Sequence, residues 1–370
     1  MLGQPISVGT NPNGVTVSPD GLMVLVANST GISVVTLQIY SAAQVVSGVV
    51  AQPTDVAAAP DASAALVWHN AMLSGAATGA SWYSIASETP TPILDEVPIV
   101  QCVFHPDPSA HQAFAVANNG PVLYIIDTSN PESVTSTEQQ LTGGGVAAAA
   151  IAVSGDGQRL FVVAPDINLE YSLVVLEFVS GAWTQQPSIQ LYQGKTFSQV
   201  WMQATPDGKT ILVIDGANSA FKAITWNATD QKYEIVTTTI QISDPVALTI
   251  LPDGSKAYVV GRATPSTITV IDIATLNAET LSLVQNFVNL QGLVASPDGR
   301  RLFGTDLSAG AVRVFDPASL RILQTLPLAA NVSQQGQGAA GLTITPDASR
   351  IFAVSTDSGT MSIFQQVPMD

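Results

Sequence analysis

The sequence predicts an all-β protein, because a short turn motif recurs eight times between apolar runs and each repeat has the pattern of four short strands. Every turn contains a Pro-Asp or Gly-Asp pair, and successive turn aspartates are roughly 40 to 50 residues apart. The turn aspartates are Asp20, Asp61, Asp107, Asp156, Asp207, Asp253, Asp298 and Asp347. Four antiparallel strands repeated at this interval are typical of a propeller blade, so we predict an eight-bladed β-propeller.

Within a repeat, the strand before the turn is short and rich in small residues, as in GVTVS at 14–18. Small side chains suit the innermost strand, where several sheets meet at one axis. The alanine-rich run 146–153 occupies this place in its repeat, so it too is predicted to be a strand. Second, third and more polar fourth strands follow, as in TILVID at 210–215, TITVIDI at 267–273 and EIVTTTIQ at 234–241.

The two ends of the chain are predicted to share one blade. The last repeat supplies three strands, and PISVG at 5–9 precedes the first innermost strand. Pairing this segment with the last strand removes two exposed sheet edges and closes the ring. The repeats leave no stretch for a second domain, so residues 1–370 are predicted to form a single propeller domain.

The composition argues against some classes of binding partner. The net charge of −16, from 28 acidic and 12 basic residues, argues against nucleic acid, whose phosphates require a basic face. The longest apolar stretch is too short to span a membrane, so no membrane insertion is expected. A surface low in Lys and rich in Ser, Thr, Asn and Gln is common on exported proteins, and it predicts a secreted, periplasmic or cell-surface protein.

The candidate ligand site is the face opposite the Pro-Asp turns, where each second strand ends in a loop. Polar residues occur there about eight positions after the turn aspartate, and they differ from repeat to repeat. A varied rim suits recognition of an asymmetric molecule. The alternative is that Asn and Asp shape these loops through their own hydrogen bonds. The predicted ligand-binding residues are Asn28, His69, Asn118, Asp215, Arg262, Asp306 and Asp357.

Signals for catalysis are few. The chain has three histidines, and neither a GxSxG nor an HExxH motif occurs. Cys102 and His105 have a metal-like spacing, but three steps along a strand place them on opposite faces, which favours structural roles. Asp166, Asn168 and Glu170 alternate as in the first half of a calcium loop, without the later glycine and glutamate. No cofactor is therefore expected, and a divalent cation such as calcium is the alternative.

Four tryptophans in strand-like runs are predicted to pack between blades rather than to form an aromatic cage for a ligand. They are Trp68, Trp82, Trp201 and Trp226.

Three segments resemble the YVTN-type propeller repeat, which is similar to the repeats of lactonase-type propellers. They are SPDGLMVLVANSTGISVVTL, LPDGSKAYVVGRATPSTITVIDIATLN and SPDGRRLFGTDLSAGAVRVFDPASLRIL. The resemblance extends over essentially the whole chain and implies a propeller. Many relatives have seven blades, whereas this chain has eight turn motifs. The family includes enzymes, binding modules and surface-protein domains, so the resemblance does not select a function.

Two functions remain open. The favoured one is a non-enzymatic recognition module that binds a protein, a glycan or a small ligand at one loop face. The alternative is a lactonase- or lyase-like enzyme at the channel mouth, with His69 and Arg262 as acid/base and oxyanion partners and Asp215 or Asp306 holding a cation.

Overall fold

The structure of the 370-residue chain is a computed structural model. It describes residues 6–17, 23–36, 44–46, 55–61, 64–68, 79–84, 86, 89–130, 133–142, 145–196, 198, 200–262, 266–282, 289–306, 309–327, 342–344, 350–355 and 360–365.

The protein is an all-β β-propeller, as predicted. Within these ranges the strands form eight antiparallel sheets, seven of four strands and one of five. The first two sheets in the chain contain β2 (Gly14–Val17), β3 (Met23–Asn28), β4 (Gly31–Thr36) and β5 (Gln44–Val46), then β6 (Asp55–Ala58), β7 (Ala64–Trp68), β8 (Ala80–Ser84) and β9 (Thr89–Pro92).

The next two sheets contain β10 (Ile99–Phe104), β11 (Gln112–Ala117), β12 (Val122–Asp127) and β13 (Thr135–Gln140), then β14 (Ala150–Val153), β15 (Arg159–Pro165), β16 (Glu170–Val179), β17 (Ala182–Gln185) and β18 (Ile189–Gln193). A short 3₁₀ helix, η1 (Pro108–Ala110), follows β10.

Three further sheets contain β19 (Val200–Ala204), β20 (Thr210–Asp215), β21 (Ala220–Asn227) and β22 (Lys232–Val236), then β23 (Pro245–Ile250), β24 (Lys256–Gly261), β25 (Thr267–Asp272) and β26 (Ala278–Ser282), then β27 (Leu290–Ala295), β28 (Leu302–Asp306), β29 (Ala311–Phe315) and β30 (Ile322–Pro327). The last sheet joins β31 (Leu342–Ile344), β32 (Arg350–Ser355) and β33 (Thr360–Gln365) to β1 (Ile6–Ser7).

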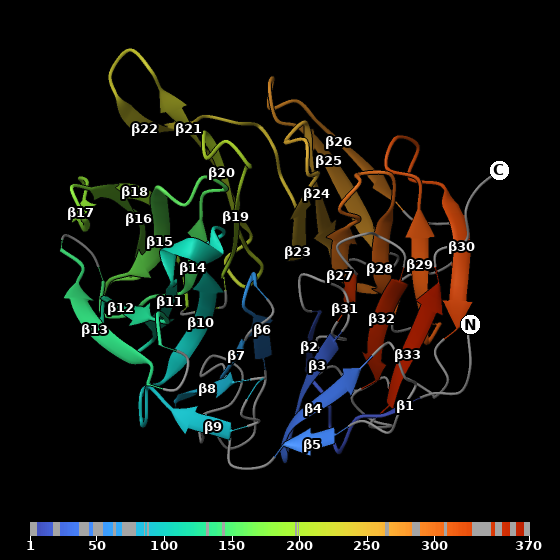
Figure 1. Cartoon of the computed structure of the whole chain (residues 1–370). Helices are drawn as coiled ribbons and strands as arrows, with labels where there is room; N and C mark the ends of the chain where they lie inside the picture. The colour runs from blue at the N-terminus through green and yellow to red at the C-terminus, as the bar shows by residue number, and fades with distance from the viewer. Residues whose placement is uncertain are drawn as a thin grey trace.

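The first strand of each sheet lies at the inside of a ring, and the last strand lies at the outside (Figure 1). The first strands contact one another in the order β2, β6, β10, β14, β19, β23, β27 and β31, and β31 in turn contacts β2. A central channel therefore runs between the first strands, with the turns at one end and the ends of the second strands at the other.

The predicted pairing of the chain's two ends is present. Ile6 of β1 pairs with Met361 of β33, and Ser7 pairs with Thr360, in antiparallel register. Val8, the next residue, is fully buried. The closing sheet thus combines three strands from the C-terminal repeat with one strand from the N-terminal segment.

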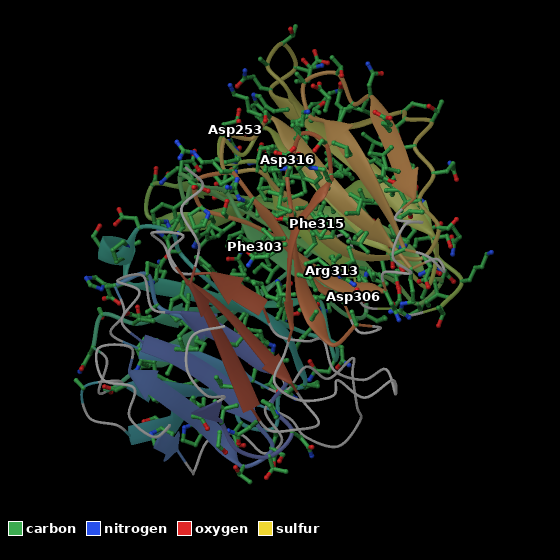
Figure 2. All side chains as sticks on the ribbon, turned by 90° about the vertical axis from the view of Figure 1, so that its right-hand side faces the viewer. Asp253, Phe303, Asp306, Arg313, Phe315 and Asp316 are labelled. Atoms are coloured by element: carbon green, nitrogen blue, oxygen red, sulfur yellow. The ribbon has the colours of Figure 1, made fainter. Side chains whose placement is uncertain are left out.

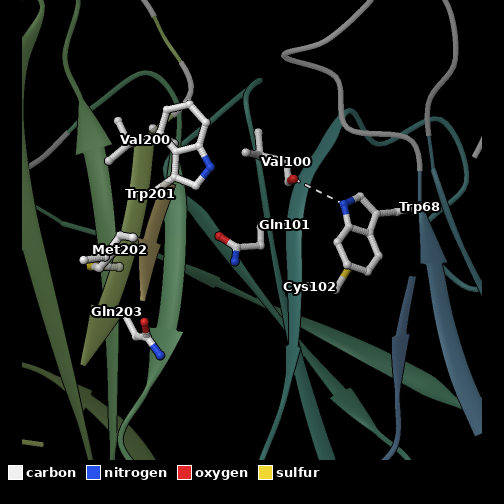
Figure 3. A pocket seen from close by; sticks show the side chains of 10 residues that line it. Trp68, Val100, Gln101, Cys102, Val200, Trp201, Met202 and Gln203 are labelled. Atoms are coloured by element: carbon white, nitrogen blue, oxygen red, sulfur yellow. Dashed lines mark hydrogen bonds between the residues drawn. The ribbon is translucent and has the colours of Figure 1, made fainter. Parts of the chain in front are cut away.

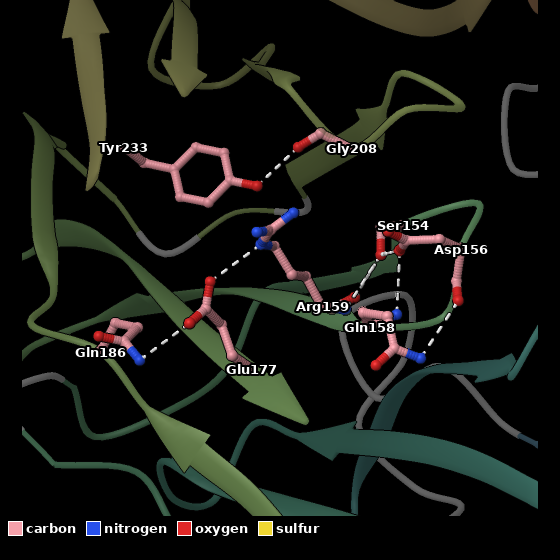
Figure 4. A network of polar contacts seen from close by, with 8 residues as sticks. All are labelled: Ser154, Asp156, Gln158, Arg159, Glu177, Gln186, Gly208 and Tyr233. Atoms are coloured by element: carbon pink, nitrogen blue, oxygen red, sulfur yellow. Dashed lines mark hydrogen bonds and ion pairs between the residues drawn. The ribbon is translucent and has the colours of Figure 1, made fainter. Parts of the chain in front are cut away.

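The Pro-Asp and Gly-Asp turns are held together by a repeated set of hydrogen bonds, shown for one turn in Figure 4. The Asp156 carboxylate accepts from the Ser154 hydroxyl and from the Gln158 backbone N–H. The Ser154 hydroxyl oxygen in turn accepts from the Arg159 N–H. Gly157 has a φ of +70°, and a Cβ built there would clash with the His105 ring, so both the backbone and the available space require glycine.

These turn hydrogen bonds predict a loss of stability in acid. Ser255 donates its N–H and its hydroxyl to Asp253, and both bonds lower the pKa of that carboxyl. A pKa lowered by folding contributes stability above the unfolded value of about 3.9, and this stability is lost as the pH falls through the folded value. The pKa values of Asp107, Asp272 and Asp316 are lowered by the same kind of bonds. We expect the free energy of unfolding to fall between about pH 5 and pH 2, as measured by urea titration.

The Asp253→Asn variant is the control for this prediction, because its amide oxygen keeps an acceptor but does not titrate. Its stability should depend less steeply on pH than that of the wild type. An unchanged slope would show that Asp253 does not contribute to the acid transition.

Neighbouring sheets pack through buried apolar and aromatic side chains. Phe161 and Tyr233, from adjacent sheets, pack edge to face with ring centroids 5.4 Å apart. Arg159 spans the same boundary. Its Nε lies 3.0 Å from Glu177 of its own sheet (Figure 4), and its guanidinium lies over the Trp226 ring of the next sheet. Throughout the described ranges, no helix is long and apolar enough to cross a membrane.

The two ends of the sheets define two faces. Figure 2 shows Asp253 and Asp316 at one end and Asp306 with Arg313 at the other, with Phe303 and Phe315 between them. We call the end with the turn aspartates the turn face. The opposite end, where the second strands finish, is the loop face.

Candidate functional site

The ends of the second strands at the loop face hold buried polar groups. Asn28, Asp215 and Asp306 finish β3, β20 and β28, and their relative exposures are 0%, 0% and 2%. They are covered because second strands lie between first and third strands and are packed on both faces. The sequence placed these residues correctly on one face of the ring but did not reveal that their side chains are buried.

Asn28 binds the N-terminal segment and its own loop. Its Nδ2 donates to the Val8 carbonyl at 2.8 Å and to Ser33 Oγ at 3.0 Å. Its Oδ1 accepts from the N–H and the hydroxyl of Thr30. Ser33 Oγ also donates to the Val8 carbonyl at 2.8 Å. Asn28 therefore connects β1 to the first complete sheet.

Asp215 is the acceptor at the centre of a polar network. Its Oδ2 accepts from the Tyr192 hydroxyl at 2.8 Å, from Ser198 Oγ at 2.7 Å and from Asn218 Nδ2 at 2.7 Å. Its Oδ1 accepts from the Asn218 N–H at 3.0 Å. Burial and the adjacent Asp215 charge raise the pKa of Tyr192, which favours the protonated hydroxyl that donates to Asp215. Ser198 Oγ is thereby held at a fixed position.

Asp306 forms a buried ion pair with Arg313. Arg313 Nε and one terminal guanidinium nitrogen each lie 2.8 Å from Asp306 Oδ2. The backbone N–H of Asn289 donates to Asp306 Oδ1 at 3.1 Å. The side chains of Asp306 and Arg313 are 0% and 12% exposed, so the pair holds the loop-face end of its sheet together.

The other predicted site residues differ in position. Arg262 is exposed, and its Nε lies 3.9 Å from the Asp244 carboxylate. Asn118 is partly buried and lines a cavity at the loop face. His69 and Asp357 lie outside the described residues.

Two cavities lie next to each other in and above the channel. The first, which we call the mouth cavity, opens among loop-face residues and has a volume of about 320 Å³. It is lined by Asn118, Val146, Ala147, Ala148, Ala149, Pro165 and Ser198. Ser198 therefore contributes a hydroxyl to the wall of this cavity, and the hydrogen bond to Asp215 holds that hydroxyl in place.

The second cavity, the channel cavity, has a volume of about 290 Å³ (Figure 3). It lies among the first strands of four consecutive sheets and the end of β7 in a fifth. It is lined by Trp68, Val100, Gln101, Cys102, Ala149, Val200, Trp201, Met202, Gln203 and Leu248. Both cavities use Ala149, which identifies the start of β14 as their common wall.

The run of four alanines at 147–150 explains why space remains there. Neighbouring first strands have Val100 and Gln101 or Val200 and Trp201 at this depth, whereas the β14 segment offers only methyl groups. The sequence pattern correctly predicted a strand here. The cavity also depends on which neighbours face the alanines, and the pattern does not contain that information.

Two glutamines join neighbouring sheets across the channel wall. Gln101 Oε1 accepts from the Ile151 N–H of β14 at 3.1 Å, and Gln203 Oε1 accepts from the Ile250 N–H of β23 at 3.0 Å. Thr249 Oγ1 makes the equivalent bond to the Ala295 N–H at 3.2 Å. Gln101, Trp201 and Gln203 were not among the ligand contacts predicted from the sequence. The signal that could have revealed them was a large polar or aromatic residue within an otherwise small-residue strand.

The remaining sequence candidates have structural contacts. His105 is buried, and its ring nitrogens lie 3.1 Å from the Asp107 carbonyl and 3.0 Å from the Gly157 carbonyl oxygen. The Asp166 carboxylate accepts from the N–H groups of Asn168 and Glu170, so it caps its own loop. Considering the described ranges alone, no group of three or more His, Cys, Asp or Glu residues is arranged to hold a metal ion.

All four tryptophans pack between sheets as predicted, and Trp68 and Trp201 also line the channel cavity. Trp201 is the more accessible of these two, so it offers an aromatic surface to a molecule in the channel.

Comparison with known proteins supports the fold and leaves the function open. No protein-family model matches this sequence, and no curated protein matches it. Among solved structures, the chain is similar to Kuenenia stuttgartiensis hydrazine synthase, with 15% identity over 99% of both chains and a TM-score of 0.59. It is also similar to a functionally unknown protein from Desulfotomaculum acetoxidans, with 16% identity over 81% of this chain and 91% of that one and a TM-score of 0.58. At these identities the likeness concerns the fold alone.

Proposed function

We propose that this protein is a non-enzymatic recognition propeller that binds a ligand at the loop-face mouth of its central channel. The observation that supports this most directly is the pair of adjacent cavities that share Ala149. Ligand sites in proteins are concave, largely preformed and lined by apolar groups with a few polar ones, and both cavities fit this description. Asn118, a predicted contact, and Ser198 supply polar groups at the mouth.

We further propose that each of the eight sheets is one blade, that the chain is related to the YVTN-type propellers, and that the protein is exported. The continuous order of contacts between first strands supports the blade number. The repeated hydrogen bonds of the Pro-Asp and Gly-Asp turns support the relation to the repeat family.

Binding is favoured over the lactonase- or lyase-like alternative because the two candidate cation ligands already have hydrogen-bond or ion-pair partners within the protein. Asp215 accepts four hydrogen bonds, and Asp306 is paired with Arg313. A carboxylate that is already surrounded by donors is a poor cation ligand. Screening the purified protein for lactone hydrolysis tests the alternative directly.

The proposal is tested by placing a larger side chain at Ala149, the residue that both cavities share. We expect uncharged fragments of a screening library, detected by ligand-observed NMR, to bind the wild type and to lose their signal with Ala149→Leu. The larger side chain fills part of both cavities. Ala182→Leu, on the exposed outer strand β17, is the matched control and should bind as the wild type does. Melting curves check that both variants fold.

If Ala149→Leu disrupts folding, Asn118→Ala and Ser198→Val probe the mouth cavity with smaller changes. Fragments that bind equally to wild type and every cavity variant, or the absence of any bound fragment, would overturn the proposal.

A further inference from the structure

The lining of the channel cavity is uncharged, although the protein has a net charge of −16. None of its ten lining residues, all of them described, has a charged side chain. Gln101, Trp201 and Gln203 supply its principal polar and aromatic groups, and all three are partly accessible. The side chains of Gln101 and Trp201 point into the space between β10 and β19 (Figure 3).

The hydrogen bonds between sheets determine which end of each glutamine amide faces the cavity. A backbone N–H requires an acceptor, so the oxygens of Gln101 and Gln203 face Ile151 N–H and Ile250 N–H. The Nε2 groups therefore point away from these bonds. No described residue accepts a hydrogen bond from either Nε2, so both amides are left to donate to a ligand.

Gln101 and Trp201 lie at the same depth in their sheets. The pairing of β10 with β11 is regular from Phe104 back to Gln101, and Gln101 pairs with Val116, the residue before the end of β11. Trp201 likewise pairs with Ile214, the residue before the end of β20. A β-bulge lies beyond Gln101, at Val100, whose carbonyl accepts from Trp68 Nε1 at 3.2 Å.

We propose that the channel cavity binds a neutral saccharide unit, an inference that rests on the proposed ligand-binding function. The Trp201 ring presents an apolar face on which the C–H face of a sugar ring packs, and the two Nε2 groups donate to its hydroxyl oxygens. The lining provides no cation to balance an anionic sugar. The acidic surface also repels anions. The chemistry thus selects uncharged, hydroxyl-rich rings.

The probes are pairs of methyl glycosides that differ in one charge. Methyl glucoside and methyl galactoside are compared with methyl glucuronide and methyl galacturonide by saturation-transfer NMR and titration. We expect at least one neutral glycoside to bind, and its uronide to bind about tenfold more weakly or not detectably, because the uronide carboxylate has no cationic partner.

Substitutions locate the site. Gln101→Glu and Gln203→Glu keep the oxygen that accepts from the neighbouring strand but lose the amide donor. Each should weaken binding by about tenfold, the effect of about one hydrogen bond, and leave melting little changed. Gln190→Glu adds the same charge on the exposed face of β18 and should bind as the wild type does. Trp201→Phe, which keeps a smaller aromatic face, should also weaken binding.

Failure of this inference is distinguishable from failure of the proposed function. If fragments bind in a manner sensitive to Ala149→Leu but no methyl glycoside binds, the saccharide assignment is wrong and the channel remains a ligand site. Uronides that bind as tightly as their neutral partners, or glycosides unaffected by Gln101→Glu and Gln203→Glu, also overturn the assignment. If neither fragments nor glycosides bind, both proposals are wrong.

Discussion

Removal of residues 1–9 is expected to lower the stability of the protein by roughly 4 to 8 kcal/mol. The deletion removes the pairing of Ile6 and Ser7 with β33 and leaves a bare edge on the closing sheet. It also removes buried Val8, whose carbonyl accepts from Asn28 Nδ2 and Ser33 Oγ. Ser33 Oγ then loses the acceptor of its hydroxyl, and Asn28 Nδ2 keeps only its bond to Ser33 Oγ. The corresponding fall in melting temperature is about 5 to 10 °C for a chain of this length.

Deletion of residues 1–5 is the control, because it keeps β1 and Val8. We expect the shorter deletion to melt close to the full-length protein and the longer one to melt clearly lower, as measured by calorimetry. Equal melting of the two deletions would show that the N-terminal strand contributes little to closure.

The Asp215→Ala variant is expected to lose about 3 to 5 kcal/mol of stability, the usual cost of removing one partner from a buried charged network. The substitution leaves Tyr192, Ser198 and Asn218 with donors that have lost a fully buried acceptor. From its position at the end of the second strand, Asp215 was predicted to contact a ligand. Its hydrogen bonds predict a structural cost instead, measured by urea unfolding.

Two matched variants separate this effect from a general loss of charge. Asp215→Asn keeps the shape and one acceptor, and the Tyr192 and Ser198 hydroxyls can rotate to accept from its amide, so it should lose less stability than Asp215→Ala. Asp244→Ala removes the exposed partner of Arg262, and it should change stability by less than about 1 kcal/mol. If Asp215→Ala were as stable as Asp244→Ala, the network would not have the assigned role.

The fold was largely predictable because its determinants are local. The turn motif specifies an aspartate that caps the turn and, in four of the described turns, a glycine at positive φ, as at Gly208, Gly254 and Gly299. The closing strand was predictable because PISVG is the one strand-like segment ahead of the first repeat. The first inference depends on residues close together in sequence, and the second depends on counting the strands at the two ends of the chain.

The site was less predictable because side-chain direction and burial depend on neighbouring sheets. Asn28 and Asp215 occupy equivalent positions in their repeats, and both are covered by segments distant in sequence. Gln101 lines a cavity whose other walls come from neighbouring sheets, which no residue pattern in β10 announces. The space beside Trp201 depends on alanines in a different sheet.

The antiparallel pairing of β1 with β33 also has a consequence for biosynthesis. The partner of Ile6 is Met361, so this contact forms only after the segment around Met361 has left the ribosome. Loop-closure entropy and high contact order make such a step late and slow relative to the formation of each sheet from adjacent strands. During synthesis the growing array of sheets therefore has an open edge at each end, a period in which nascent chains are vulnerable to pairing with one another.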